Sequence, residues 1–231
     1  RTGKGFSTGM AAVAGAVGGA VASVVDRAMS SIGDLWSEAS AMSDGLQKFK
    51  STLEFAGLDT KNIERLAKSA RKYADQTVYD LTDIQNITAQ LASNGVKDYD
   101  RLAEAAGNVN AIAGGNAETF KSVGMVLTQT AGQGKLTAEN WNQLSDAIPG
   151  ASGKIQEALL KNNAFVGNFR DAMSKGQITA EEFNTALLQL GNEPVAVEAA
   201  KSTETLEGAF GNLQATVVGA MSDALTTVKP I

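Results

Sequence analysis

A nine-residue pattern occurs twice in the chain, first as Gly134–Asn142 (GKLTAENWN) and again as Gly176–Asn184 (GQITAEEFN). Each copy is typical of a short turn between two helices. Its glycine suits the left-handed conformation that ends a helix. The threonine three residues later can accept a hydrogen bond from a free backbone N–H of the next helix. We therefore predict a helical domain in which Thr137 and Thr179 are helix caps.

Two further features support helix starts of this kind. The aromatic residue of each copy, Trp141 or Phe183, supplies the first large apolar side chain of the new helix, so we predict both as core anchors. A third cap is predicted at Thr82, because Thr82–Gln85 has the spacing of a capping box.

The second copy also fits part of a calcium-binding pattern. Gly176 and Glu182 match positions six and twelve of an EF-hand loop. The earlier ligand positions would then fall on Asp171, Met173 and Lys175, of which one is a carboxylate and one is a cation. We favour helix capping over calcium binding and predict no metal site. Added calcium should change neither folding nor the melting temperature.

The composition narrows the function classes. The chain has 231 residues, a net charge of −5, and no cysteine or histidine. This excludes disulfides, thiolate nucleophiles and Ser-His or Cys-His catalytic arrangements. The negative net charge also argues against a surface that binds the phosphate backbone of a nucleic acid, so we predict no direct nucleic-acid site. The basic face of residues 61–72 is interpreted as solvated rather than as a site for an acidic partner.

Two carboxylate pairs are the remaining candidates for catalysis: Asp80 with Asp83, and Glu181 with Glu182. In a suitable pocket such pairs could perform glycoside hydrolysis. Here both fall at predicted helix starts, where capping and the helix dipole explain acidic residues. We therefore predict a protein that is not an enzyme and needs no cofactor.

The sequence predicts an all-α fold, with a compact multi-helix domain flanked by longer amphipathic helices. The chain has three prolines, none before Pro149, and no run shows the alternation typical of strands. About eight short helices are predicted between residues 57 and 192. Three parts follow: an apolar small-residue helix leading into a long amphipathic helix (1–56), the compact domain (57–195), and the start of a long helix continuing beyond the fragment (196–231).

The first of these parts contains an uncharged stretch, residues 10–25, with small residues at every fourth position. These are Ala11, Gly15, Gly19 and Ser23. Such a face lets helices approach closely, above all in membranes. Three interpretations remain open: a close-packed helix in an oligomer, a membrane-inserting segment, and a secretory signal peptide.

The last part carries an apolar seam with the alternating spacing of a coiled coil. It begins with Leu206, Phe210, Leu213 and Val217. We predict this seam as a surface through which copies of the chain associate.

Four segments of the chain, in order, resemble one known family. They are Tyr73–Leu81; Gly132–Leu136 with Asn142–Leu144 and Ile148–Gly150; Met173–Thr179 with Phe183; and Leu206–Leu213. Together they resemble the tape measure domain of tail tape measure proteins of tailed phages, over about residues 52–218. Tyr79 and the Gly/Ser-rich stretch Ala151–Gly153 depart from the family pattern.

The resemblance implies a structural virion protein that lies in the tail tube lumen, determines tail length during assembly and is released with DNA ejection. It implies that copies of the chain form a homo-oligomer, described as threefold. It also implies three other partners: the tail tube protein, tail assembly chaperones and the host membrane, which residues 10–25 would contact during infection. The alternative is a membrane-active or secreted helical protein that uses residues 10–25 for insertion.

Overall fold

The computed structural model describes residues 43–201, and the all-α fold class is confirmed within this range. Residues 43–55 form a helix that precedes α3. The remaining helices are α3 (Thr60–Gln76), α4 (Leu81–Ser93), α5 (Tyr99–Ile112), α6 (Ala117–Gln133), α7 (Ala138–Ala147), α8 (Pro149–Lys161), α9 (Phe169–Ser174), α10 (Ala180–Gly191) and α11 (Pro194–Lys201).

The short helices predicted between residues 57 and 192 correspond to α3–α10. Helix α8 begins at Pro149 and includes the Gly/Ser-rich stretch Ala151–Gly153. Proline suits this first position because its fixed φ is already helical and its missing N–H is not needed there. Helix α9 begins at Phe169, and the buried Phe165 lies in the connection before it.

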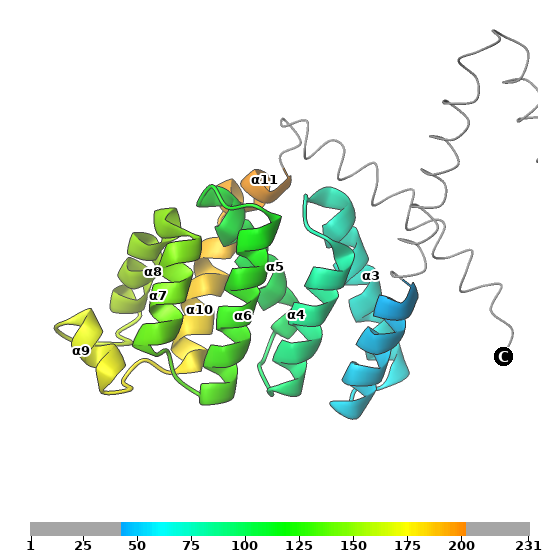
Figure 1. The fold of residues 1–231 in the computed structure, drawn as a ribbon, viewed down its shortest axis with the longest axis horizontal. Helices are drawn as coiled ribbons and strands as arrows, with labels where there is room; N and C mark the ends of the chain where they lie inside the picture. Colours follow the sequence, from blue (N-terminus) through cyan, green and yellow to red (C-terminus); the bar gives the residue numbers. More distant parts are fainter. Residues whose placement is uncertain (1–42, 202–231) are drawn as a thin grey trace, which may run out of the picture.

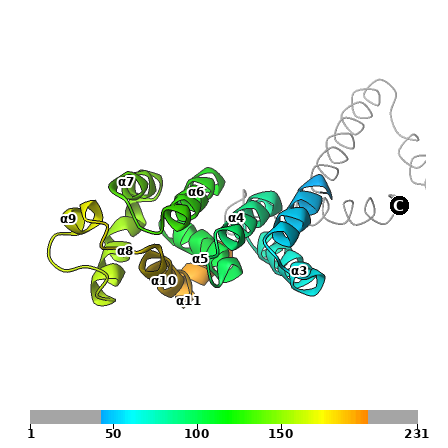
Figure 2. The same cartoon turned by 90° about the horizontal axis from the view of Figure 1, so that it is seen from below.

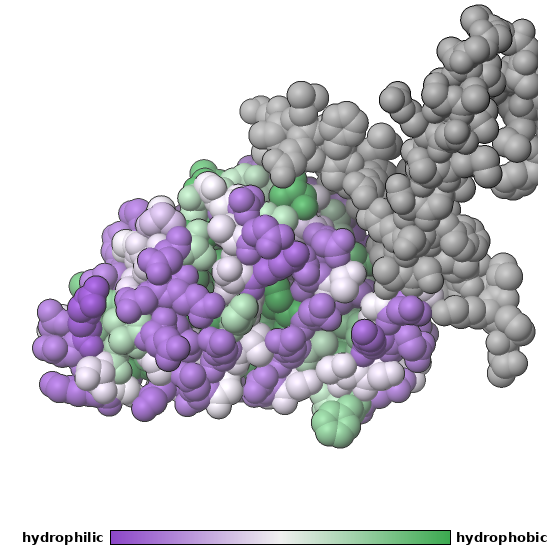
Figure 3. Space-filling model, in the orientation of Figure 1, coloured by the Kyte–Doolittle hydropathy of each residue, from purple (hydrophilic) through white to green (hydrophobic). Residues whose placement is uncertain are grey.

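The helices stand side by side in an elongated array (Figure 1). Helix α3 and the helix at residues 43–55 form one end, and α8 and α9 form the other (Figures 1 and 2). Viewed along the helices, α4, α6 and α7 make one layer, while α8 and α10 lie in a second layer with α5 beside them (Figure 2). Most of the described face is hydrophilic, with small apolar patches (Figure 3).

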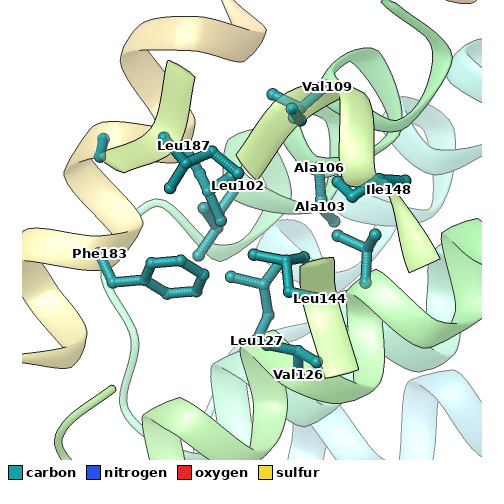
Figure 4. Close-up of a cluster of buried hydrophobic side chains, with 14 of the residues drawn as sticks. Leu102, Ala103, Ala106, Val109, Val126, Leu127, Leu144, Ile148, Phe183 and Leu187 are labelled. Atoms are coloured by element: carbon teal, nitrogen blue, oxygen red, sulfur yellow. The ribbon is translucent and has the colours of Figure 1, made fainter. Parts of the chain in front are cut away.

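The main core lies between the two layers. Its centre is formed by α5, α6, α7 and α10, which direct side chains toward one another (Figure 4). Leu102, Leu127, Leu144 and Phe183 are fully buried there. Burial of side chains of this size is worth roughly 1.5–3 kcal/mol each, so this core dominates the stability of the domain.

Packing extends past both of the predicted domain borders. Phe49 and Leu53, in the part assigned to residues 1–56, are buried in a second apolar cluster with residues of α3 and α4. At the other end α11 crosses the border at residue 195, packs against α5 and buries Ala196 and Ala200.

Candidate functional site

The two copies of the repeated pattern lie against each other, which the sequence analysis did not predict. The N–H of Leu136 donates to the carbonyl of Ile178 at 2.9 Å, and the N–H of Ala180 donates to the carbonyl of Gly134 at 3.0 Å. These two bonds flank an antiparallel bridge between Lys135 and Thr179. The turns between α6 and α7 and between α9 and α10 therefore form one unit, here called the paired turns.

Each of the paired turns also starts a helix. Thr137 is the N-cap of α7, and its hydroxyl accepts from the N–H of Asn140 at 3.2 Å. Thr179 is the N-cap of α10 in a full capping box: its hydroxyl accepts from the N–H of Glu182, and the Glu182 carboxylate accepts from the N–H of Thr179 at 2.8 Å. The turns thus join the two layers and begin two helices at once.

The predicted cap at Thr82 is wrong. Asp80 is the N-cap of α4, and its carboxylate accepts from the N–H of Thr82 at 2.7 Å. Thr82 itself lies in the first turn of the helix. The extended backbone at Asp80 lets its short acidic side chain reach an N–H two residues further on, so the helix starts earlier than the capping-box pattern indicated.

The two aromatic anchors both contact the core. Phe183 is fully buried, near Leu102 and Leu187 (Figure 4). Trp141 is almost fully buried and meets the ring of Phe169 edge to face, with ring centroids 4.7 Å apart. Such pairs add roughly 0.5–1.5 kcal/mol beyond the area they bury.

The geometry of the second turn does not suit calcium. Met173, which would be the third loop position, is buried in the main core, and Glu182, the twelfth, is used by the capping box. Within residues 43–201 no group of three or more acidic side chains is placed to hold a metal ion.

The two carboxylate pairs serve helix starts and ion pairs. Asp83 lies 3.6 Å from the ammonium of Lys121, and partial burial raises the pKa of its carboxyl group while that ammonium opposes the rise. Glu181 lies 3.6 Å from the ammonium of Lys97, with both side chains mostly exposed.

A buried polar cluster joins α3, α5 and the segment before α4, and the sequence analysis missed it. Tyr79 donates to the carbonyl of Gly107 at 2.7 Å and accepts from the amide of Asn110 at 2.9 Å. Tyr73 donates to the side-chain oxygen of Asn108 at 2.9 Å. Burial raises the pKa of Tyr79 to about 12, and burial also raises the pKa of Tyr73.

Asn108 also joins α5 to the end of α10, because its amide donates to the carbonyl of Gly191 at 2.9 Å. The sequence signal for this cluster was the pair Asn108 and Asn110 inside a helix. Asparagine is unfavourable there unless its side chain finds a specific partner.

Several predicted residues lie outside the described part of the chain. They are Ala11, Gly15, Gly19 and Ser23, together with the seam Leu206, Phe210, Leu213 and Val217. In the part that is described, no helix combines the length and the apolar character needed to cross a membrane.

These contacts define a helical structural module, since the polar side chains that the structure describes mainly cap helices and join them to one another. The family model for tape measure proteins matches residues 37–224, and the chain belongs to this family. The resemblance found in the sequence is thereby confirmed.

Individual relatives agree with this assignment. A tape measure protein of Lactococcus phage F4-1 is 27% identical over 143 residues, which cover 60% of this chain and 39% of the relative. A probable tape measure protein of Lactococcus phage p2 is 24% identical over 200 residues, covering 84% of this chain and 19% of the relative. The chain thus spans less than half the length of these curated relatives. No solved structure matches the chain.

Proposed function

We propose that the chain is part of a structural virion protein that determines the length of a phage tail during assembly. The observation that carries this proposal is the family match, which covers residues 37–224 and so most of the chain. In this proposal the protein lies in the tail tube lumen and leaves with the DNA at ejection.

The proposed partners follow from the same assignment. They are further copies of the chain, in a threefold homo-oligomer that uses the seam beginning at Leu206, the tail tube protein, tail assembly chaperones, and the host membrane through residues 10–25. The candidate surfaces for the first and last of these partners lie outside the described residues.

The described domain contributes to this role as a folded module, and its number of residues does not set the tail length in proportion. A helix advances about 1.5 Å per residue, so residues 57–195 would span roughly 200 Å as one continuous helix. The longest labelled helices, α3 and α6, have 17 residues each and reach only about 25 Å. The chain reverses between neighbouring helices, so little of its contour length becomes length along the tail (Figure 1).

The test is an in-frame deletion of residues 57–195 in the phage, followed by electron microscopy of the tails. We expect far fewer complete tails, and a length change in the remaining tails that is much smaller than about 200 Å. Tails that assemble in normal number and are shortened by that full amount would contradict the role of a folded module.

A variant of unchanged chain length separates folding from length. Phe183→Ala removes a fully buried side chain and should reduce tail number while leaving tail length unaltered. Gln156→Ala, an exposed change on α8, is the matched control and should assemble normally. Normal tail number with an unfolded Phe183→Ala domain would show that the folded module is not needed.

A further inference from the structure

Three side-chain hydrogen bonds join α3 to α5, and in each the two partners are 35 residues apart in the chain. They link Arg65 Nη1 to Asp100 Oδ2 at 3.1 Å, Ser69 Oγ to Glu104 Oε1 at 3.1 Å, and Tyr73 Oη to Asn108 Oδ1 at 2.9 Å. The constant separation means that α3 and α5 run parallel with these pairs in register. We call this set the α3–α5 ladder.

The apolar contacts of this end of the molecule are largely internal to it. Residues 43–76, here called the N-terminal hairpin, supply Phe49, Leu53, Ile63 and Leu66 to the second apolar cluster. Residues 81–201, here called the body, supply Ala89 to the buried members of that cluster, and Ala92 and Tyr99 of the body pack against it. The hairpin would therefore keep much of its own apolar burial if it separated from the body.

The last turns of α3 are the part of the hairpin that enters the main core. Ala70, Tyr73 and Ala74 are buried there. Two of them are alanines, so Tyr73 is the one large side chain of the described hairpin in that core. Its hydroxyl bonds to Asn108 and to the carbonyl of Glu104, which makes it the main attachment of the hairpin to the body.

The connection between hairpin and body lies between two buried tyrosines. Tyr73 belongs to α3, whereas the hydroxyl of Tyr79, just before α4, bonds to α5 through Gly107 and Asn110. The two tyrosine rings are stacked with their centroids 6.2 Å apart. Residues 77–79 between them are not helical. A rotation at residues 77 and 78 could move α3 while Tyr79 stays in place.

We propose that the N-terminal hairpin opens from the body as one unit, turning about residues 77 and 78 and releasing the α3–α5 ladder, while α4–α10 stay folded. The ladder suits such opening because water can replace its polar contacts, and the Arg65 side chain is already 57% exposed. Tyr73 is the latch that must leave its site. Opening uncovers Ala89 and the α5 side of the ladder.

Hydrogen exchange of the full 231-residue chain, followed by mass spectrometry, tests this proposal. In the unmodified protein, peptides from residues 43–76 should exchange at least tenfold faster than the protected peptides of α5 and α10, as a separate cooperative unit. Exchange of the hairpin and the body in a single step would overturn the proposal.

Variants of the two tyrosines form a matched pair. Tyr73→Phe removes the latch hydroxyl and should speed hairpin exchange by about tenfold while leaving α10 unchanged. Tyr79→Phe removes a hydroxyl bonded only within the body and should instead speed exchange of α5. Equal effects of the two changes on all peptides, or no effect of Tyr73→Phe on the hairpin, would also overturn the proposal.

A covalent lock provides the reverse test, because the chain has no cysteine of its own. Ser69→Cys with Glu104→Cys, joined by a short thiol-specific cross-linker such as dibromobimane, should hold α3 on α5. Exchange of residues 43–76 should then slow to the rate of the body, while the same variant without cross-linker stays fast. Unchanged hairpin exchange in the cross-linked protein would count against opening along the ladder.

Discussion

In the body, α5, α6, α7 and α10 meet through fully buried apolar side chains such as Leu127 and Phe183, and the paired turns add two backbone hydrogen bonds. In the N-terminal hairpin, α3 meets α5 largely through the polar ladder, and the apolar cluster of the hairpin faces mainly inward. In both regions, helices that follow one another in the chain are joined by short connections. What differs is how much apolar surface each buries against its neighbours.

The comparison teaches that regular helices do not by themselves make a cohesive domain. Apolar burial gives roughly 25 cal/mol per Å², whereas an exposed ion pair contributes about 0–1 kcal/mol. The polar pairs of the α3–α5 ladder therefore fix the register of the two helices but contribute little to the free energy that holds them together. Substitutions in each region test that difference in cohesion.

Truncation of the two cores should have unlike consequences. Phe183→Ala should lower the free energy of unfolding of the whole domain by about 3–5 kcal/mol, because it leaves a cavity in the main core. Leu53→Ala removes an equally buried side chain from the hairpin cluster and should mainly release the hairpin. Urea unfolding followed by circular dichroism, with exchange by region, distinguishes them. If Leu53→Ala destabilised the body as much as Phe183→Ala does, the two regions would not differ in cohesion.

A close contact between α10 and α5 allows a second test in the body. A Cβ at Gly191 would collide with the backbone and Cβ of Ala105, and backbone atoms cannot move aside cheaply. Gly191→Ala should therefore cost about 1–3 kcal/mol in thermal unfolding.

The control for that test is Gly153→Ala in α8, where an added Cβ meets nothing within 4 Å. It should stabilise the domain by about 0.5–1 kcal/mol, because alanine favours a helix over glycine. A stabilised Gly191→Ala protein would show that α5 and α10 separate more readily than their packing indicates.

The caps of the paired turns should have smaller effects. Thr137→Ala and Thr179→Ala should each cost about 1 kcal/mol, since each removes a side-chain acceptor from a helix N-terminus. Thr82→Ala should leave stability nearly unchanged, whereas Asp80→Ala should lower it, because Asp80 is the N-cap of α4. Melting temperatures of the four variants test this order. A costly Thr82→Ala would restore the cap predicted from the sequence.

The smallest effect concerns the charge within the ladder. Burial raises the pKa of Glu104, although the hydrogen bond from Ser69 opposes this rise. A carboxyl group with a raised folded-state pKa favours folding at acidic pH, and that contribution is lost as pH rises through the folded pKa. Glu104→Gln keeps an acceptor for Ser69, so it should hold the hairpin as well or better at neutral pH, by less than about 1 kcal/mol.

Unfolding of the Glu104→Gln protein between pH 4 and 8 should show a weaker loss of stability with rising pH than the unaltered protein shows. Glu198→Gln, an exposed change outside the ladder, is the control and should keep the original profile. A Glu104→Gln hairpin that opens more readily at neutral pH would mean that the carboxylate acts through its neighbours Lys72 and Arg101.

Sequence signals were most successful where the interacting groups are close in the chain. Gly134 ends α6 in the left-handed conformation, and the hydroxyl of Thr137 caps α7 from three residues away. The same reasoning failed at Thr82, because Asp80, two residues earlier, caps the same helix. The Gly/Ser-rich stretch Ala151–Gly153 also departs from the family pattern in sequence, yet the fold holds it inside α8.

The all-α class, the series of short helices and most of their starts follow from local sequence signals, because caps and breakers act within about four residues. Three contacts depend on the three-dimensional packing alone: the pairing of the repeated turns, the bond from Asn108 to Gly191 across 83 residues, and the polar ladder between α3 and α5. Such contacts depend on how helices pack. Hydrophobic periodicity defines which face of a helix is buried but not which helix will cover it.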